Sequence, residues 1–249
     1  MPVPASSPYS RHIADGLFLV DKPAGPTSHD VVAQFRRHLH FKKIGHGGTL
    51  DPMATGLLVL LLGRGTKLSN FVMGSDKTYD ATFYFGKTTD TQDAEGRILE
   101  QKETGSLSKD AIHDELTKWT GDMMQTPPMV SAIKQNGVPL YKLARKGKCV
   151  KREPRLIHVY SLRLLDYEPP KARIRVACTK GTYVRTLAAD IGDALGCGAH
   201  LSALRRTRSG PFSVDDALPL SALLAMDTKD LIQRIIPSAT VQTMAYGYP

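Results

Sequence analysis

The segment that most constrains the fold is rich in glycine and carries a single aspartate: residues 45–56, GHGGTLDPMATG. Its four glycines let the backbone take left-handed conformations and approach a ligand closely. The apolar run Leu57 to Leu62 follows at once and predicts a strand that is buried on both faces. The side chain of Asp51 is therefore expected to project from a tight, irregular loop beside the core. The residues allow two interpretations of it, a structural Asx turn or a carboxylate fixed for chemistry.

The rest of the chain mixes strand and helix patterns. Apolar alternation predicts strands over residues 16–20, 78–85, 174–178 and 199–207. Helical spacing predicts helices after a capping box of Thr27 and Asp30, near residues 68–72 and 112–119, before Gly147, and over residues 183–195. Because no regular βαβ order is present, we expect an α+β fold with a central mixed, mostly antiparallel sheet flanked by helices and loops.

Turn signals and the C-terminus complete this outline. Asp90 to Gly96 indicates a polar turn, and Asn136-Gly137 indicates a tight one. Ala239 to Pro249 has no clear periodicity and predicts a loose tail.

The composition excludes several classes of protein. The 249 residues are 41% hydrophobic, enough for a substantial core, yet contain no run of about 18 apolar residues. The start, Met1 to Ser10, lacks the apolar stretch of a secretory signal. We therefore expect a cytoplasmic protein that does not bind membranes. Cys149, Cys178 and Cys197 are widely spaced with no CxxC pair, which predicts reduced thiols rather than a metal site or disulfide framework.

Positive charge is concentrated in one segment. Lysine and arginine number 33 against 24 acidic residues, a net charge of +9. Residues 134–155 hold eight basic side chains and one acidic one, Glu153, so this segment carries +7 of that charge. Arg205, Arg206 and Arg208 form a second basic cluster. Such focusing favours a polyanionic partner, because phosphate contacts release counterions, although a solvated surface is the ordinary alternative.

The sequence excludes two kinds of catalytic site, a phosphate-binding loop and the zinc site of a nucleobase deaminase. Gly63-Arg64-Gly65-Thr66-Lys67 is not a phosphate-binding loop, because that motif needs glycine directly before lysine. A zinc deaminase needs HxE with PCxxC, and the sequence has neither. A lone carboxylate remains, and carboxylates can act as nucleophiles when an arginine orients them and keeps them ionised. Arg185, at a predicted strand-to-helix junction, is a candidate partner for Asp51.

Five segments in this order resemble the motifs of the TruB-type tRNA pseudouridine synthases: DKPAGPTS at 21–28, GHGGTLDPMATG at 45–56, SDKTY at 75–79, CTKGTYVRTL at 178–187, and GCGAHL at 196–201 with the following Leu204-Arg205-Arg206. The resemblance is collinear over about residues 14–236. It implies a pseudouridine synthase fold, with residues 1–13 as an N-terminal extension, 14–236 as the catalytic domain and 237–249 as a C-terminal tail.

The resemblance also implies a role for individual residues. Asp51 would be the nucleophile, Arg185 would pair with it, and Tyr79 would stack on the target uracil. The other substrate contacts implied are His46 beside the extruded nucleotide, and Tyr183 and Leu204 in the pocket wall. The family's substrate is the uridine at position 55 in the T-loop of tRNA, and the family uses no cofactor and no metal.

The chemistry of this reaction suits these residues. The N1–C1′ bond breaks, the uracil turns, and a C5–C1′ bond forms without water. The base must first leave its stack, which costs a few kcal/mol, and a stack on an aromatic side chain, worth about 1–3 kcal/mol, offsets that cost. Asp51 could attack C1′ or C6, or assist an elimination at the sugar, and the residues leave these routes open.

The expected partner is the T-arm of tRNA. We expect its phosphates to be bound by the basic segment, residues 134–155, through Lys134, Lys142, Arg145, Lys146, Lys148, Lys151 and Arg152. No obligate protein partner is expected, and the lack of a heptad pattern favours a monomer. Many relatives carry a further C-terminal domain of the PUA type, which this chain is expected to lack. Two alternatives remain: a tRNA-folding chaperone, which would not need Asp51, and a guide-RNA-dependent enzyme, which usually needs that domain.

Overall fold

The computed structural model describes residues 15–39, 43–105, 107–135, 137–148 and 150–246. The N-terminal extension expected at 1–13, Asn136 of the predicted turn, and Cys149 lie outside these ranges. The chain divides into two compact units, Met1–Ser75 with Arg206–Pro249, and Asp76–Arg205. The domain boundaries expected after residues 13 and 236 stay predictions.

The first unit is built on two long central strands. Its strands are β1 (Gly16–Lys22), β2 (Ile44–His46), β3 (Thr55–Leu62), β13 (Phe212–Ser213), β14 (Leu218–Pro219) and β15 (Ile236–Pro237). Its helices are α1 (Ser28–Leu39), α2 (Ser69–Gly74), α6 (Leu220–Ala225), α7 (Thr228–Gln233) and α8 (Ser238–Tyr246), with 3-10 turns η2 (Gly63–Leu68) and η3 (Val214–Asp216). Strand β1 pairs antiparallel with β3 and parallel with β14, and β2 pairs antiparallel with β3.

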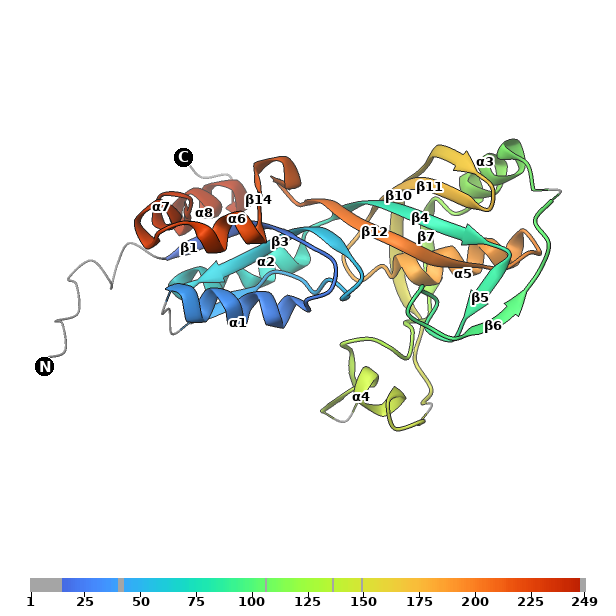
Figure 1. Ribbon diagram of the computed structural model, residues 1–249, viewed down its shortest axis with the longest axis horizontal. Coiled ribbons are helices and arrows are strands. Elements are labelled where there is room, and N and C mark those ends of the chain that lie inside the picture. Colours follow the sequence, from blue (N-terminus) through green and yellow to red (C-terminus); the bar gives the residue numbers. More distant parts are fainter. Residues whose placement is uncertain (1–14, 40–42, 106, 136, 149, 247–249) are drawn as a thin grey trace, which may run out of the picture. The chain divides into compact units, whose positions relative to one another are not determined.

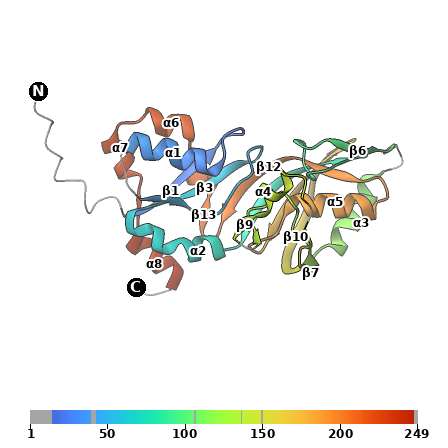
Figure 2. The same cartoon turned by 90° about the horizontal axis from the view of Figure 1, so that it is seen from below.

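Strand β3 is buried on both faces, as its apolar run predicts. Figure 2 shows why: α1 and α6 lie on one side of β1 and β3, and α2 and α8 lie on the other. Towards α1, the rings of Phe18 and Phe35 pack with their centroids 5.5 Å apart. Towards α2 and α8, the two strands contribute to one apolar cluster, which contains Leu17, Leu19, Leu57, Val59, Leu61, Leu68, Val72, Phe212 and Val241.

The first helix begins at the capping box that the sequence predicts. The Asp30 carboxylate accepts hydrogen bonds from the Thr27 backbone N–H (2.9 Å) and from Thr27 Oγ1 (2.7 Å). Thr27 Oγ1 in turn accepts from the Asp30 N–H at 3.1 Å. These bonds satisfy donors that the first turn of a helix leaves unpaired, so the start of α1 is fixed locally.

The prediction of a loose tail over residues 239–249 is wrong for residues 239–246, because these residues lie in α8. Val241 has no exposed surface and belongs to the cluster on β1 and β3. The sequence gives little sign of this helix, since a short segment shows a weak period. Burial against the strands, rather than helix propensity, stabilises it.

The second unit is built on a strongly curved sheet. Its strands are β4 (Lys77–Phe85), β5 (Lys87–Thr89), β6 (Ile98–Gln101), β7 (Gly121–Gln125), β8 (Lys134–Gln135), β9 (Val138–Pro139), β10 (Arg155–Glu168), β11 (Lys171–Cys178) and β12 (Ala199–Ser209), whose residues from Arg206 on belong to the first unit. Its helices are α3 (Lys109–Lys118), α4 (Leu140–Ala144) and α5 (Val184–Ala194), as Figure 1 labels them. Within this unit the strand order is β12-β4-β11-β10-β7.

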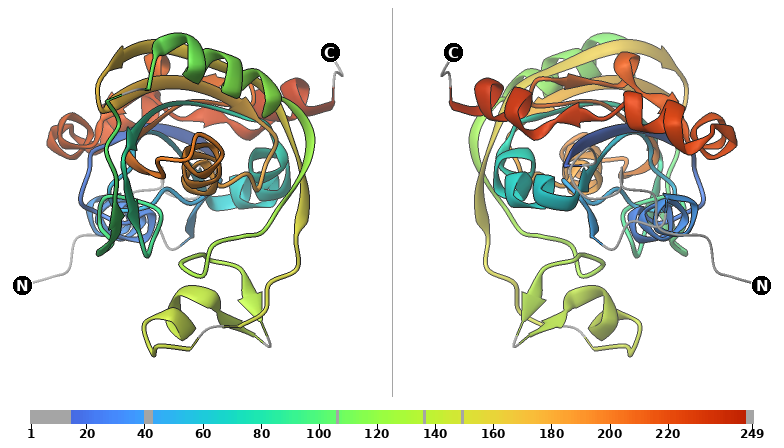
Figure 3. Two further views of the ribbon diagram at one scale, coloured as in Figure 1. Left: turned by 90° about the vertical axis from the view of Figure 1, so that its right-hand side faces the viewer. Right: turned by 90° about the vertical axis from the view of Figure 1, so that its left-hand side faces the viewer.

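Helix α5 lies under this sheet, and Figure 3 shows the strands curving over it. Strands β4, β11, β10 and β7 pair antiparallel with their neighbours. The helix ends as predicted, because Gly196 takes a left-handed φ of 79° and its N–H donates to the Asp193 carbonyl at 2.9 Å. Strands β7 and β10 were not expected, whereas β4, β11 and β12 extend the predicted strands by a few residues.

The predicted fold class is confirmed: the sheet is mixed and mostly antiparallel, with helices packed on it. Cys178 and Cys197 are buried free thiols, as expected. No helix within the described ranges is long and apolar enough to span a membrane.

Candidate active site

The glycine-rich loop that carries Asp51 joins β2 to β3 in the first unit. It begins with a short strand rather than the irregular chain expected, because residues 44–46 pair with β3. The Gly47 N–H then donates to the Val59 carbonyl at 2.8 Å. Beyond it, the Ala54 N–H donates to the Asp51 carbonyl at 3.1 Å, which closes a turn around the half-buried Asp51.

Lys22, at the end of β1, holds the far side of this loop. Its side chain has no exposed surface. Its ammonium group donates to three carbonyls, those of Pro23 (2.8 Å), Pro52 (3.2 Å) and Ala54 (2.7 Å). A buried ammonium ion needs such acceptors, so the lysine and the chain on both sides of Met53 fix each other.

The first turn of α1 holds the near side of the loop. Ser28 Oγ accepts from the Leu50 N–H at 2.9 Å and donates to the Leu50 carbonyl at 3.2 Å. The Gly25 N–H donates to the Pro52 carbonyl at 2.9 Å. The residues immediately before and after Asp51 are thus both tethered to the segment Lys22–Ser28, and the direction in which the carboxylate leaves the loop is constrained.

His46 stands at the start of the same loop, half-buried. Its ring meets that of His29 edge to face, with centroids 5.2 Å apart. Burial lowers the pKa of His46 to about 4, helped by the positive charges of His29 and Arg206. The imidazole is therefore neutral at physiological pH.

In the second unit, Arg185 is buried near the start of α5. Its Nη1 donates to Asp93 Oδ2 at 3.0 Å, and both side chains are 4% exposed. Its Nη2 donates to the Val130 carbonyl at 2.8 Å. The guanidinium is thus held by residues from two loops.

Asp93 was not predicted as a site residue, because it lies in the segment 90–96 that only indicates a turn. Its Oδ1 accepts from Thr91 Oγ1 (2.6 Å) and from the Glu95 N–H (3.1 Å), which leaves Oδ2 directed at Arg185. The sequence signal that could have identified Asp93 is the density of polar side chains in a turn close to a β-strand. Its burial, which singles it out from the other polar residues of the turn, is visible only in the structure.

Tyr183 immediately precedes α5 and is fixed by Gln125 of β7. The Gln125 side-chain Oε1 accepts from the Tyr183 N–H at 2.8 Å, and Nε2 donates to the Tyr183 carbonyl at 3.1 Å. Gln125 is 4% exposed. The start of α5, which has no side-chain cap of its own, is therefore positioned by a neighbouring strand. Gln125 is a second residue that sequence reasoning missed.

Tyr79 and Leu204 lie on neighbouring strands, β4 and β12. Tyr79 is half-buried and pairs in register with Val176 of β11, and Leu204 is 9% exposed. The structure thus brings Asp51 together with His46 in the first unit, and Tyr183 together with Arg185 in the second. The pairing of Asp51 with Arg185 joins the two units and stays a prediction.

The basic segment of residues 134–155 projects from the ends of β7 and β10 as the hairpin β8–β9 and helix α4 (Figure 1). Six of the seven basic residues expected to bind RNA are exposed: Lys134, Lys142, Arg145, Lys146, Lys148 and Lys151. Arg152 differs, because it is half-buried and its Nη1 donates to the Pro127 carbonyl at 3.2 Å. In the second basic cluster Arg206 is only 2% exposed, so it adds no exposed charge to that cluster.

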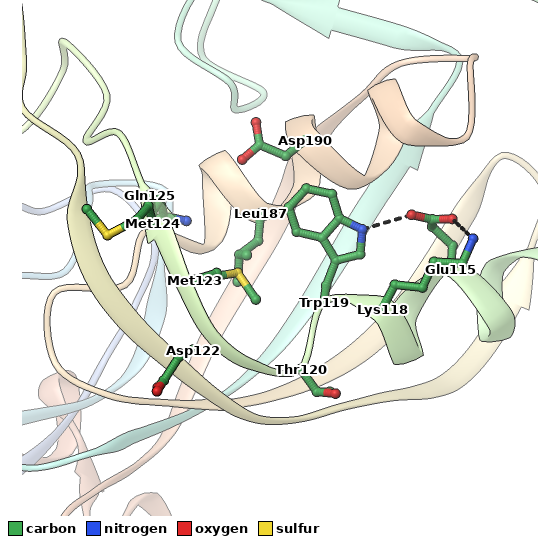
Figure 4. Close-up of a pocket in the computed structure, with 10 residues that line it drawn as sticks. All are labelled: Glu115, Lys118, Trp119, Thr120, Asp122, Met123, Met124, Gln125, Leu187 and Asp190. Atoms are coloured by element: carbon green, nitrogen blue, oxygen red, sulfur yellow. Dashed lines mark hydrogen bonds and ion pairs between the residues drawn. The ribbon is translucent and has the colours of Figure 1, made fainter.

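A pocket of about 340 Å³ opens between α3, β7 and α5. Figure 4 shows the Trp119 indole between Leu187 and Glu115, with the Trp119 N–H donating to the Glu115 carboxylate at 2.9 Å. Burial raises the pKa of Asp190 at its edge. Its described lining includes none of the residues predicted for the active site, but it does include Gln125, so the pocket lies behind the residue that holds Tyr183.

Solved structures share this fold over nearly the whole chain. One, described as the crystal structure of a Cbf5-Nop10-Gar1 complex, is 31% identical with a TM-score of 0.74, and the match covers 94% of this chain and 63% of that one. Another, the structure of an H/ACA RNP bound to a substrate RNA containing 2'-deoxyuridine, is 28% identical with a TM-score of 0.69, covering 92% and 61%. The chain thus spans less than two thirds of the length of these structures.

Relatives of known name are more similar still. The tRNA pseudouridine synthase B of Opitutus terrae is 52% identical over 227 residues, which is 91% of this chain and 94% of that protein. That of Syntrophotalea carbinolica is 50% identical over 216 residues, 87% of this chain and 71% of its own length.

Two family models match in sequence. Residues 36–184 match the TruB family pseudouridylate synthase N-terminal domain, and residues 185–241 match the tRNA pseudouridylate synthase B C-terminal domain. Together with the mixed sheet and the tethered aspartate loop, these matches define a pseudouridine synthase. The chain belongs to the TruB family of these enzymes.

Proposed function

We propose that this protein converts uridine 55 in the T-loop of tRNA into pseudouridine, with Asp51 as the nucleophile. Family membership supports the reaction, and one observation carries the assignment of the residue. Asp51 lies in a loop whose neighbours on both sides are bonded to the segment Lys22–Ser28. A carboxylate held in this way has a fixed direction, and positioning of the reacting group is a large part of catalysis.

The reaction is an isomerisation in which every atom of the nucleotide is kept. The N1–C1′ bond breaks, the uracil turns within a closed pocket, and C5 bonds to C1′ as its proton leaves and N1 is protonated. Asp51 adds to C1′ or C6, or removes a sugar proton in an elimination, and is released at the end. No water is consumed, and the proposal, following the family, assigns no cofactor or metal to any step.

The other predicted residues receive their roles from this proposal. Tyr79 stacks on the uracil once it has left its helix, and Tyr183 and Leu204 line the pocket. His46, neutral because its pKa is about 4, packs beside the extruded nucleotide. Arg185 pairs with Asp51 and is in turn held by Asp93 and the Val130 carbonyl. An arginine paired with a carboxylate keeps that carboxylate ionised.

The partner proposed is the T-arm of tRNA, bound through the basic segment. Its exposed lysines and arginines offer phosphate contacts, whereas the half-buried Arg152 shapes the segment from inside. We further propose that the enzyme acts in the cytoplasm, as a monomer and without an obligate protein partner.

Mapping of pseudouridine in total tRNA tests the function. A deletion strain should lack the modification at position 55, and the parent gene should restore it. Asp51→Asn should restore none, whereas Asp216→Asn, an exposed acidic residue of the same unit, should restore it fully. Persistence of the modification in the deletion strain contradicts the proposal. If the protein acts mainly as a chaperone, Asp51→Asn should fold tRNA as well as the parent does and should restore growth of the deletion strain.

A further inference from the structure

Arg206 is a buried cation in the first unit. Its neighbours Arg205 and Arg208 are more exposed, and the sequence gives no reason to separate the three. Only 2% of Arg206 is exposed. A guanidinium this deeply buried must have its donors bonded, because the desolvation of a charge is otherwise costly.

The acceptors of Arg206 are all backbone carbonyls of the segment that carries Asp51. Its Nε donates to the Leu57 carbonyl at 2.8 Å and its Nη2 to the Gly48 carbonyl at 3.2 Å. A longer bond joins Nη1 to the Thr49 carbonyl at 3.4 Å. One planar fork therefore spans both ends of the loop, before and after Asp51.

Two glycines of this segment lie against Arg206, one against its backbone and one against its side chain. Gly56, with φ at +95°, passes so close to the backbone of Arg206 that a Cβ there would lie 2.3 Å from its carbonyl oxygen. Gly48, with φ at +140°, lies against the guanidinium, and a Cβ there would be 3.5 Å from Nη1. Two of the loop's glycines thus have left-handed conformations at their contacts with one arginine.

We propose that Arg206 is a positioning residue of the enzyme, whose guanidinium binds the carbonyls of Gly48, Thr49 and Leu57 and so fixes the direction of the Asp51 carboxylate. This assignment rests on the proposed function for its effect on rate. Arg206 touches neither substrate nor reacting atoms in this role. It adds to the tethers from Lys22 and Ser28, because it binds three carbonyls that neither of those side chains contacts.

A second consequence distinguishes this role from mere structural support. The positive charge of Arg206 is one cause of the lowered pKa of His46, after burial and the charge of His29. A neutral replacement should therefore raise the pKa of His46, whereas a replacement that keeps the charge should change it less. A packing defect that exposes His46 would instead raise its pKa in both variants, because burial is the largest cause of the lowered value.

The test compares Arg206→Gln, Arg206→Lys and Arg64→Gln with the parent. Arg64 is an exposed arginine of the same unit, with a side chain 75% exposed, and controls for the loss of one charge. Single-turnover rate and tRNA affinity are measured for each. The His46 pKa and the backbone order of residues 47–51 are measured by NMR without RNA.

We expect Arg206→Gln to lower the single-turnover rate about 100-fold, because a displacement of about 1 Å at a reacting group costs that much. Arg206→Lys, which keeps the charge but offers no planar fork, should lose about 10-fold. The tRNA affinity should stay within about threefold in both, as expected for a loss confined to the chemical step. The His46 pKa should rise in the glutamine variant, with residues 47–51 less ordered in both variants.

A parent-like rate, His46 pKa and loop order in folded Arg206→Gln would overturn the inference. Should the glutamine variant fail to fold, the lysine variant decides, since unchanged rate and loop order in it contradict the proposal equally. If the parent itself modifies no tRNA, the proposed function fails. The NMR measurements, which need no substrate, then still support or refute the role of Arg206 in the loop.

Discussion

The ion pair of Arg185 with Asp93 is closed off from solvent, with both side chains 4% exposed. Two buried charges of this kind are a weak source of stability but a strong constraint, because removal of one leaves the other uncompensated. Here the constraint falls on the arginine that we assign to the catalytic aspartate. Asp93 therefore connects a turn that looks unremarkable in sequence to the site.

Asp93→Asn should lower both stability and activity. The side chain keeps its shape but loses its charge, so we expect a loss of up to about 3–5 kcal/mol in the free energy of unfolding, the result of breaking a buried pair. The proposed pairing of Arg185 with Asp51 would reduce this loss, because it leaves the arginine one carboxylate partner. Urea unfolding and single-turnover assays measure the two effects. Asp90→Asn is the control from the same turn. Asp90 pairs with Arg97, whose side chain is 87% exposed, so loss of this pair should lower the free energy of unfolding by no more than about 1 kcal/mol. Equal losses in both variants contradict the argument.

His46 makes stability depend on pH in a stated direction. Its pKa is lowered from 6.5 to about 4, so the unfolded chain takes up a proton where the folded chain does not. The stability that this residue contributes is present above about pH 6.5 and is lost as the pH falls towards 4. The free energy of unfolding in urea should therefore fall more between pH 7 and pH 5 in the parent than in His46→Gln. His113→Gln, at an exposed helical position, should follow the parent.

At the scale of elements, α5 begins where β7 places it. The helix carries Arg185 in its first turn, yet Tyr183, the residue just before it, is positioned by a glutamine 58 residues away in sequence. Both bonds of that glutamine are to the backbone of Tyr183, so β7 determines where the helix starts and how Tyr183 is presented. The capping box of α1, by contrast, is made by residues within one turn.

Gln125→Ala should therefore loosen the start of α5. It leaves the N–H and the carbonyl of Tyr183 without these partners, and we expect a loss of about 1–3 kcal/mol in the free energy of unfolding. The exposed Gln135→Ala serves as the control. Hydrogen exchange of the Tyr183 amide, which should become faster only in Gln125→Ala, gives the local measurement. Unchanged protection there speaks against the role of β7.

The elements differ in how far the sequence predicts them. Strands β1, β3 and β4 and helices α1, α3 and α5 follow from apolar periods and local caps, and each is found close to its expected position. Strand β7 was not predicted, and the residues of helix α8 were predicted to be a loose tail. Each element is short and gains its stability from a partner that is distant in sequence. Val241 of α8, for example, is buried in a cluster that includes residues of β1 and β3, from the other end of the chain.

At the scale of the whole molecule, charge is distributed unevenly. Most of the net charge of +9 lies between residues 134 and 155, in a segment that projects from the sheet. Phosphate contacts release counterions, so each contact adds about 0.7–0.9 to the slope of log affinity against log salt. The basic segment should therefore dominate the salt dependence of tRNA binding.

Neutralisation of Lys146, Lys148, Lys151 and Arg152 to glutamine should weaken tRNA binding and flatten its salt dependence, by about two units of slope if the three exposed lysines make contacts. Binding measured from 50 to 200 mM salt tests this. A control variant removes the same number of exposed charges elsewhere, at Lys102, Lys109, Lys229 and Arg234. A slope that falls equally in the control, or not at all in the first variant, refutes the assignment of the segment.

The sequence by itself determined the α+β class, the loop that carries Asp51 and the family, because these depend on local periods, glycines and short motifs. Tertiary structure alone decided which polar residues hold that loop in the first unit and which hold Arg185 and Tyr183 in the second. Lys22, Asp93, Gln125 and Arg206 look like ordinary surface residues in the sequence, and each is buried. Burial is a property of the assembled chain, and a buried polar group must find its hydrogen-bond partners wherever the fold supplies them. Asp51 could thus be named from its motif, whereas the residues that hold its loop could not.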